Sequence, residues 1–128
     1  NVENIILSKS GEINFIDFGE SHRAEIISDI AIAMKEVIIT NKGVDLGLMR
    51  AYLDSYQEIT RLDKDELNVL FFLFRRRTVF MIAYLLNKQE KNEIIDFRRK
   101  IANEIRVLKI LQENRQLIKS FIKEYKYD

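Results

Sequence analysis

Hydrophobic side chains change their spacing once along this chain, and that change limits the folds open to it. Before residue 17, two short apolar runs at 4–7 and 13–16 flank the turn at 8–11, as antiparallel strands do. From about residue 28 onward, apolar residues recur at helical spacing almost to the C-terminus. The sequence therefore predicts an α+β, mostly helical chain, with a β-hairpin over 4–17 and four or five helices over 28–126.

Capping residues predict where the first two helices begin and end. We expect Ser28 or Asp29 to cap the first helix and Gly43 to lie just past its end. Asp45 should cap a second helix that runs to about Ile59. The side chains predicted to face inward are Ile30, Ala33, Met34, Val37 and Ile38 in the first helix, and Leu48, Tyr52, Leu53 and Tyr56 in the second.

The third helix has the strongest start signal. Asp63 should cap it, with Glu66 as its capping-box partner and a hydrophobic staple between Leu62 and Leu67. It should end near Leu86, and residues 93–125 should form one long helix or two shorter ones. The side chains predicted to face inward are Val69, Leu70, Leu73, Phe74 and Val79, and then Ile94, Ile101, Ile105, Leu108, Leu111, Ile118, Ile122 and Tyr125.

Composition excludes several classes of function. Twenty-one Lys and Arg residues against twenty Asp and Glu give a net charge of +1, so no general positive field favours nucleic acid. No apolar run approaches the roughly 18 residues of a membrane span, and the first residues do not resemble a signal peptide. Cysteine is absent, which excludes disulfides and thiolate metal sites. We expect a cytoplasmic protein that binds neither nucleic acid nor membrane.

Two oxygen-bearing side chains stand at the ends of the predicted hairpin. Asn4 begins its first strand, and Asp17 follows its second within the run Phe-Ile-Asp-Phe-Gly-Glu. Amide and carboxylate oxygens suit a hard cation such as Mg²⁺. A strand that ends in Asp-Phe-Gly, with an Asn upstream, is typical of the metal site of protein-kinase-like enzymes. Alternatively, Asp17 is an acidic turn residue and Asn4 a polar residue at a strand start.

Three segments, Asn4-Ile5-Ile6-Leu7, Ile16-Asp17-Phe18-Gly19 and Ser28-Asp29-Ile30-Ala31, together resemble the aminoglycoside phosphotransferase and choline kinase-like family of small-molecule kinases. The match covers about the first third of the chain. Residues 52–58 and 63–67 look more loosely like the hydroxylysine kinase and homoserine kinase-like branches. The resemblance implies a protein-kinase-like C-terminal lobe over 1–128, and the stretch 22–27 departs from it by lacking a Gly-Pro.

The resemblance also implies roles for individual residues. Asn4 would bind Mg²⁺, and Asp17 would bridge the metal and the β- and γ-phosphates of ATP. Asp29 would support the catalytic loop, although it would serve equally well as a helix cap. The family's catalytic Asp falls upstream of Asn1, as do its ATP-covering lobe and phosphate-binding Lys. We therefore expect the chain on its own to be inactive.

The implied reaction transfers the γ-phosphate of ATP to a hydroxyl of an amino alcohol, amino acid, sugar or aminoglycoside. Asp54 and Glu58 lie one helical turn apart and could receive an amino group of that substrate, or form a solvated face. One alternative is a catalytically inactive, kinase-like helical interaction module. Another is oligomerisation through the C-terminal helix, whose apolar stripe is interrupted by Gln112 and Arg115.

Other polar residues have simpler interpretations. His22, the single histidine, lies in a polar loop and is expected to be solvated. The arginines at 75–77 spread over about 200° of a helix, so they cannot form one patch. We expect them, and the basic residues at 98–100, to pair with nearby carboxylates.

Overall fold

The computed structural model describes residues 4–16, 26–90 and 96–126. These residues form five helices and two short hairpins, so the predicted mostly helical α+β chain is confirmed and a second hairpin is added. In chain order the elements are β1 (Ile5–Leu7), β2 (Ile13–Phe15), α1 (Ile26–Ile38), β3 (Ile39–Thr40), β4 (Gly43–Val44), α2 (Leu46–Gln57), α3 (Lys64–Glu90), α4 (Phe97–Glu113) and α5 (Arg115–Glu124).

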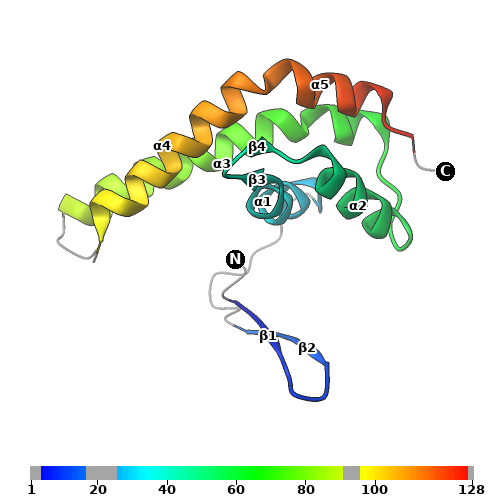
Figure 1. The fold of residues 1–128 in the computed structure, drawn as a ribbon, viewed down its shortest axis with the longest axis horizontal. Helices are drawn as coiled ribbons and strands as arrows, with labels where there is room; N and C mark the ends of the chain where they lie inside the picture. Colours follow the sequence, from blue (N-terminus) through cyan, green and yellow to red (C-terminus); the bar gives the residue numbers. More distant parts are fainter. Residues whose placement is uncertain (1–3, 17–25, 91–95, 127–128) are drawn as a thin grey trace.

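The long helix α3 organises the helical body. Helices α4 and α5 follow one another along it, and α1 packs against it with α2 alongside (Figure 1). Their facing side chains form one apolar core. Its fully buried members include Ile30, Met34, Ile38, Met49, Leu53, Leu70, Phe74, Leu111 and Ile118.

Helix α1 differs from its predicted form at both ends. It already includes Ile26, so Ser28 and Asp29 lie inside the helix and the prediction that one of them caps it is wrong. After Ile38 the chain enters the β3–β4 hairpin, whose turn places Gly43 at φ 114°. The core face runs through Ile27, Ile30, Ala31, Met34 and Ile38, whereas Ala33 and Val37 are exposed.

The predicted caps of α2 and α3 are confirmed. The Leu48 amide donates to Asp45 Oδ1 at 3.0 Å. At α3 the Glu66 amide donates to Asp63 Oδ1 at 2.7 Å, and the Asp63 amide donates to Glu66 Oε2 at 2.9 Å. This is the reciprocal pair of a capping box. Leu62 and Leu67, the predicted staple, are both buried.

The inward faces of α2 and α3 were predicted only in part. In α2 the buried residues are Met49, Leu53 and Gln57, and Leu48 is exposed. In α3 the predicted Val69 and Val79 lie on the exposed side. The predicted Leu70 and Phe74 are buried, and the same face also includes Leu67, Phe71, Thr78 and Leu85.

Residues 96–126 form two helices rather than one. Asn114 separates α4 from α5, and its side-chain amide donates to the Ile110 carbonyl at 2.9 Å. The buried positions of the pair are Val107, Leu111, Ile118 and Ile122, with Tyr125 directly after α5. Ile105 is exposed, and Ile94 lies outside the described residues.

Over the described ranges, no helix is both long enough and apolar enough to cross a membrane.

Candidate functional site

The β1–β2 hairpin carries the first part of the predicted metal site. Its antiparallel register pairs Ile5 with Phe15, Ile6 with Asn14 and Leu7 with Ile13. The turn is closed by the Ser8 amide, which donates to the Glu12 carbonyl at 2.8 Å. Gly11 adopts φ 86°, a conformation that glycine reaches without a steric penalty. Turn and register together determine which residues meet at the open end of the hairpin.

Asn4 lies at that open end, directly opposite Ile16. The Ile16 amide donates to the Asn4 carbonyl at 3.0 Å. Asp17 is the next residue in sequence. Asp17 itself and His22 lie outside the described residues. The structure therefore aligns Asn4 with the residue that precedes Asp17.

The donor chemistry of this end of the hairpin fits Mg²⁺. Asn4 offers an amide oxygen and Asp17 a carboxylate, and Mg²⁺ is commonly held by one or two such groups together with waters and substrate phosphates. Within the described ranges, no three His, Cys, Asp or Glu side chains come together as a cation site. A cation here would depend on Asn4, on residues outside those ranges and on a phosphate ligand.

The hairpin presents an apolar face that no described element covers. Ile5, Leu7, Ile13 and Phe15 alternate onto one side of the two strands, and each is between 45% and 69% exposed. The hairpin lies apart from the helical body (Figure 1). Because an isolated two-stranded hairpin is only marginally stable in water, this face has the character of a packing surface.

Asp29 lies in the first turn of α1 with its side chain exposed. It is close enough to α2 to act on Tyr52. Burial raises the pKa of Tyr52, and repulsion from the ionised form of Tyr56 and from the Asp29 carboxylate raises it further. The predicted support of a catalytic loop by Asp29 involves residues outside the described ranges.

Asp54 and Glu58, the predicted acceptor-binding residues, lie at the C-terminal end of α2. Asp54 Oδ1 accepts a 2.7 Å hydrogen bond from the Tyr125 hydroxyl. The same hydroxyl accepts one from Gln57 Nε2 at 3.0 Å. Burial, helped by the hydrogen bond to Asp54, raises the pKa of Tyr125 to about 12. Asp54 thus joins α2 to the end of α5, while Glu58 is the exposed C-cap residue of α2.

Sequence reasoning did not find this cluster around Tyr125. Gln57 also accepts the Leu62 amide at 3.2 Å, which links the cluster to the loop before α3. Lys64 Nζ donates to the carbonyls of Ile122 and Lys123 at 2.8 and 2.9 Å. A tyrosine at the end of an amphipathic stripe was the available signal, but its partners lie 68 and 71 residues away.

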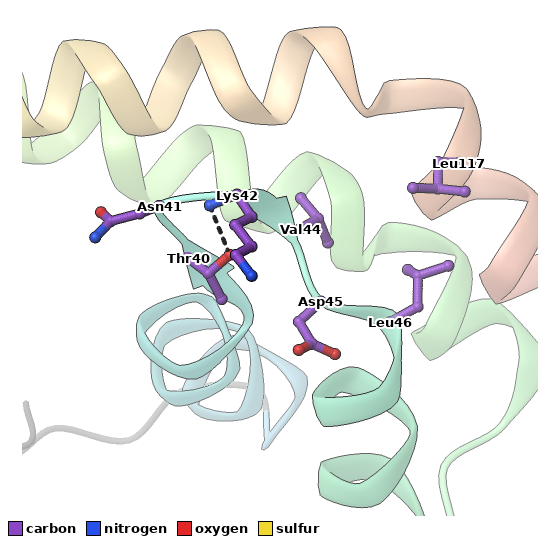
Figure 2. A pocket seen from close by; sticks show the side chains of 7 residues that line it. All are labelled: Thr40, Asn41, Lys42, Val44, Asp45, Leu46 and Leu117. Carbon is purple, nitrogen blue, oxygen red and sulfur yellow. Dashed lines mark hydrogen bonds between the residues drawn. The ribbon is translucent and has the colours of Figure 1, made fainter.

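A hollow on the helical body lies beside the β3–β4 turn. Its volume is about 620 Å³, and it is lined by Thr40, Asn41, Lys42, Val44, Asp45, Leu46 and Leu117. Thr40 Oγ1 accepts the Lys42 amide at 3.1 Å, and Lys42 and Asp45 bring opposite charges to the polar side (Figure 2). Val44, Leu46 and Leu117 form the apolar side. Of the predicted site residues that the structure describes, Asn4, Asp29, Asp54 and Glu58, none lines this hollow.

Comparison with known proteins yields no relative for this chain. No family model matches it, and no curated protein or solved structure matches it significantly.

Proposed function

We propose that the chain is the C-terminal part of an ATP- and Mg²⁺-dependent small-molecule phosphotransferase. The observation that carries the proposal is the hairpin register, in which Asn4 is bonded to Ile16, the residue before Asp17. This register sets Asn4 across from the residue that precedes Asp17 in sequence, and that nearness supports a cation shared by the two residues. The kinase-like motif around Asp17 gives that pairing a chemical purpose.

The roles of the residues follow from the demands of phosphoryl transfer, which needs charge compensation and alignment more than covalent chemistry. Bound Mg²⁺ would neutralise charge on the β- and γ-phosphates of ATP. Asn4 and Asp17 would hold it, with Asp17 as the charged ligand. The acceptor would be a hydroxyl of an amino alcohol, amino acid, sugar or aminoglycoside, oriented by an Asp supplied upstream of Asn1.

The uncovered face of the hairpin supports the same proposal. This face is an exposed apolar surface, made of Ile5, Leu7, Ile13 and Phe15. Exposed apolar surfaces of this kind commonly mark sites of contact with other protein surfaces. A β-hairpin that carries a kinase-like metal site would pack this face against the rest of the catalytic domain.

The test is an ADP-release assay with Mg²⁺ and ATP on the protein that includes the residues encoded upstream of Asn1, against a panel of the four acceptor classes. We expect turnover with one class and its loss in Asp17→Ala. Asn4→Ala should raise the Mg²⁺ requirement. Glu12→Gln, which changes an acid at the turn of the same hairpin, should leave turnover unchanged.

A second readout does not need turnover. Bound Mn²⁺ enhances water-proton relaxation, so titration of Mn²⁺ with ATP should show a complex that Asp17→Ala loses and Glu12→Gln retains. Full activity in Asp17→Ala would overturn the metal assignment. Neither turnover nor Mn²⁺–ATP binding in the unmodified protein would instead favour the inactive, kinase-like interaction module.

A further inference from the structure

Helix α3 carries a second apolar face that no described element covers. We define the outer seam as Val69, Phe72, Arg76, Val79, Ala83 and Leu86. Successive members are three, four, three, four and three residues apart, which is the a/d spacing of a coiled-coil helix. Five of the six are apolar, and Arg76 is the exception.

The exposures show that the outer seam faces away from the core. Val69, Phe72, Val79 and Leu86 are between 41% and 64% exposed, and Ala83 is exposed as well. The opposite side of the same helix is buried at Leu70, Phe74 and Thr78. A surface helix normally has a single apolar face, which it turns to the core. The core covers one face of α3, so the outer seam lacks a partner among the described residues.

The exposed arginines at the outer seam indicate the charge that its partner should carry. Arg76 lies within the outer seam and Arg75 at its edge, and both are exposed. The ion pairs that the described residues form involve neither arginine, contrary to the pairing predicted from the sequence. Arg77 is used differently, because its guanidinium lies 5.6 Å from the centre of the Phe80 ring. A positive charge in an apolar seam requires an opposing carboxylate once the seam is covered.

A second copy of the chain fits this surface poorly. In a parallel pair, Arg76 would face Arg76 of the other copy, with two like charges in one layer. In an antiparallel pair centred on the seam, Arg76 would pack against Val79 and still lack a carboxylate. A single charged residue at an a position selects a partner that carries its complement.

We propose that the outer seam binds an amphipathic helix of another polypeptide, which packs as a coiled coil and places a Glu or Asp opposite Arg76. Its other contact positions are apolar and fill the spaces around Phe72, Val79 and Leu86. This proposal is independent of the phosphotransferase reaction, because the outer seam contains none of the residues assigned to the metal site.

The test uses the whole chain and two synthetic helices. Each peptide has about three heptads with Leu at the a and d positions. The Glu peptide has Glu at the central a position, and the Lys peptide has Lys there. Fluorescence anisotropy of labelled peptides gives both dissociation constants. We expect the chain to bind the Glu peptide at least about tenfold more tightly, as a close interfacial charge pair would require.

A charge exchange makes the test specific to Arg76. The Arg76→Glu variant should prefer the Lys peptide, and Phe72→Ala should weaken both complexes. Arg98→Glu makes the same change in net charge at an exposed position of α4 and should keep the preference for the Glu peptide. Circular dichroism confirms that each variant is folded, as expected for substitutions at exposed positions.

Three results would overturn the proposal. The first is no binding of either peptide, and the second is equal binding of both, which would indicate unspecific apolar adhesion. The third is self-association in sedimentation velocity that Phe72→Asp abolishes, because the outer seam would then be an interface between copies of this chain.

Discussion

At the scale of single residues, the Tyr125 hydroxyl is the contact that attaches the C-terminal end of the fold. It donates to Asp54 Oδ1 and accepts from Gln57 Nε2. Its removal therefore takes away one hydrogen bond from each of these two side chains. We predict that Tyr125→Phe lowers the free energy of unfolding by about 1–3 kcal/mol. Urea denaturation followed by circular dichroism measures this change. Tyr84→Phe, at an exposed tyrosine, should leave stability unchanged.

The same hydroxyl predicts a dependence on alkaline pH. Its pKa rises from 10.0 to about 12 in the folded chain, so the folded state holds the phenolic proton more tightly than the unfolded state. The resulting stabilisation is complete below pH 10 and is lost as pH rises from about 10 to about 12. Tyr125→Phe should remove this part of the pH dependence. A stability profile identical in the two proteins above pH 10 would contradict the assignment.

Residue-scale contacts of this kind were only partly readable from sequence. The amphipathic stripe correctly placed Tyr125 inward, because periodicity reports which side of a helix is buried. It could not identify Asp54 and Gln57 as partners, since that pairing depends on how α2 and α5 meet in space. For the same reason the sequence offered Asp54 as a substrate-binding or solvated acid and did not reveal the hydrogen bond that its carboxylate accepts from Tyr125.

At the scale of elements, the start of α3 is stabilised by its own sequence. The reciprocal bonds between Asp63 and Glu66 satisfy two amides that the first helical turn would otherwise leave without acceptors. We predict that Asp63→Ala lowers the free energy of unfolding by about 1 kcal/mol. Asp65→Ala is the matched control, because Asp65 lies in the same turn with an exposed side chain. Its lost dipole interaction and gained helix propensity should nearly cancel. Equal effects in chemical denaturation would show that charge, not capping, matters here.

Local signals explain why the starts of α2 and α3 were predicted better than their buried faces. The caps at Asp45 and Asp63 depend on residues three positions apart, so the sequence alone determined them. The buried face of α3 was not determined in this way, because the helix has two apolar faces. Val69 and Val79, predicted as core, belong to the outer seam. Periodicity alone cannot decide which of two apolar stripes meets the rest of the fold.

At the scale of the whole molecule, the sequence predicted more about the hairpin with its candidate metal site than about how the helices pack together. The hairpin and its register follow from the turn at 8–11, and the register places Asn4 next to the residue before Asp17. The catalytic Asp that the resemblance implies is not among the residues of this sequence. The sequence also could not predict where the proposed acceptor would bind, since such a pocket would depend on how helices far apart in sequence come together.

The helical body also contains a buried lysine, Lys35, that the hydrophobic pattern of the sequence did not predict to be buried. Lys35 of α1 is 3% exposed, and its Nζ lies 3.7 Å from Glu104 Oε2 of α4 and 3.1 Å from Glu36 Oε1. Glu104 Oε2 is buried and has no hydrogen-bond partner among the described residues. The distance to Lys35 is that of an ion pair without a hydrogen bond. The pair connects α1 to α4. Because no hydrogen bond forms between the two groups, their attraction only partly offsets the cost of removing both charges from water.

We therefore predict that removing one charge of this pair destabilises the fold, and removing both does not. Glu104→Leu should lower the free energy of unfolding by about 1–3 kcal/mol, because it leaves Lys35 buried with Glu36 as its nearest carboxylate. The double variant Lys35→Met with Glu104→Leu should be at least as stable as the original chain, since apolar packing then replaces a poorly hydrogen-bonded ion pair. Thermal and urea denaturation of the two single variants and the double variant give the coupling energy. A double variant clearly less stable than the original chain would show that the pair stabilises the association of α1 with α4 by more than its desolvation costs.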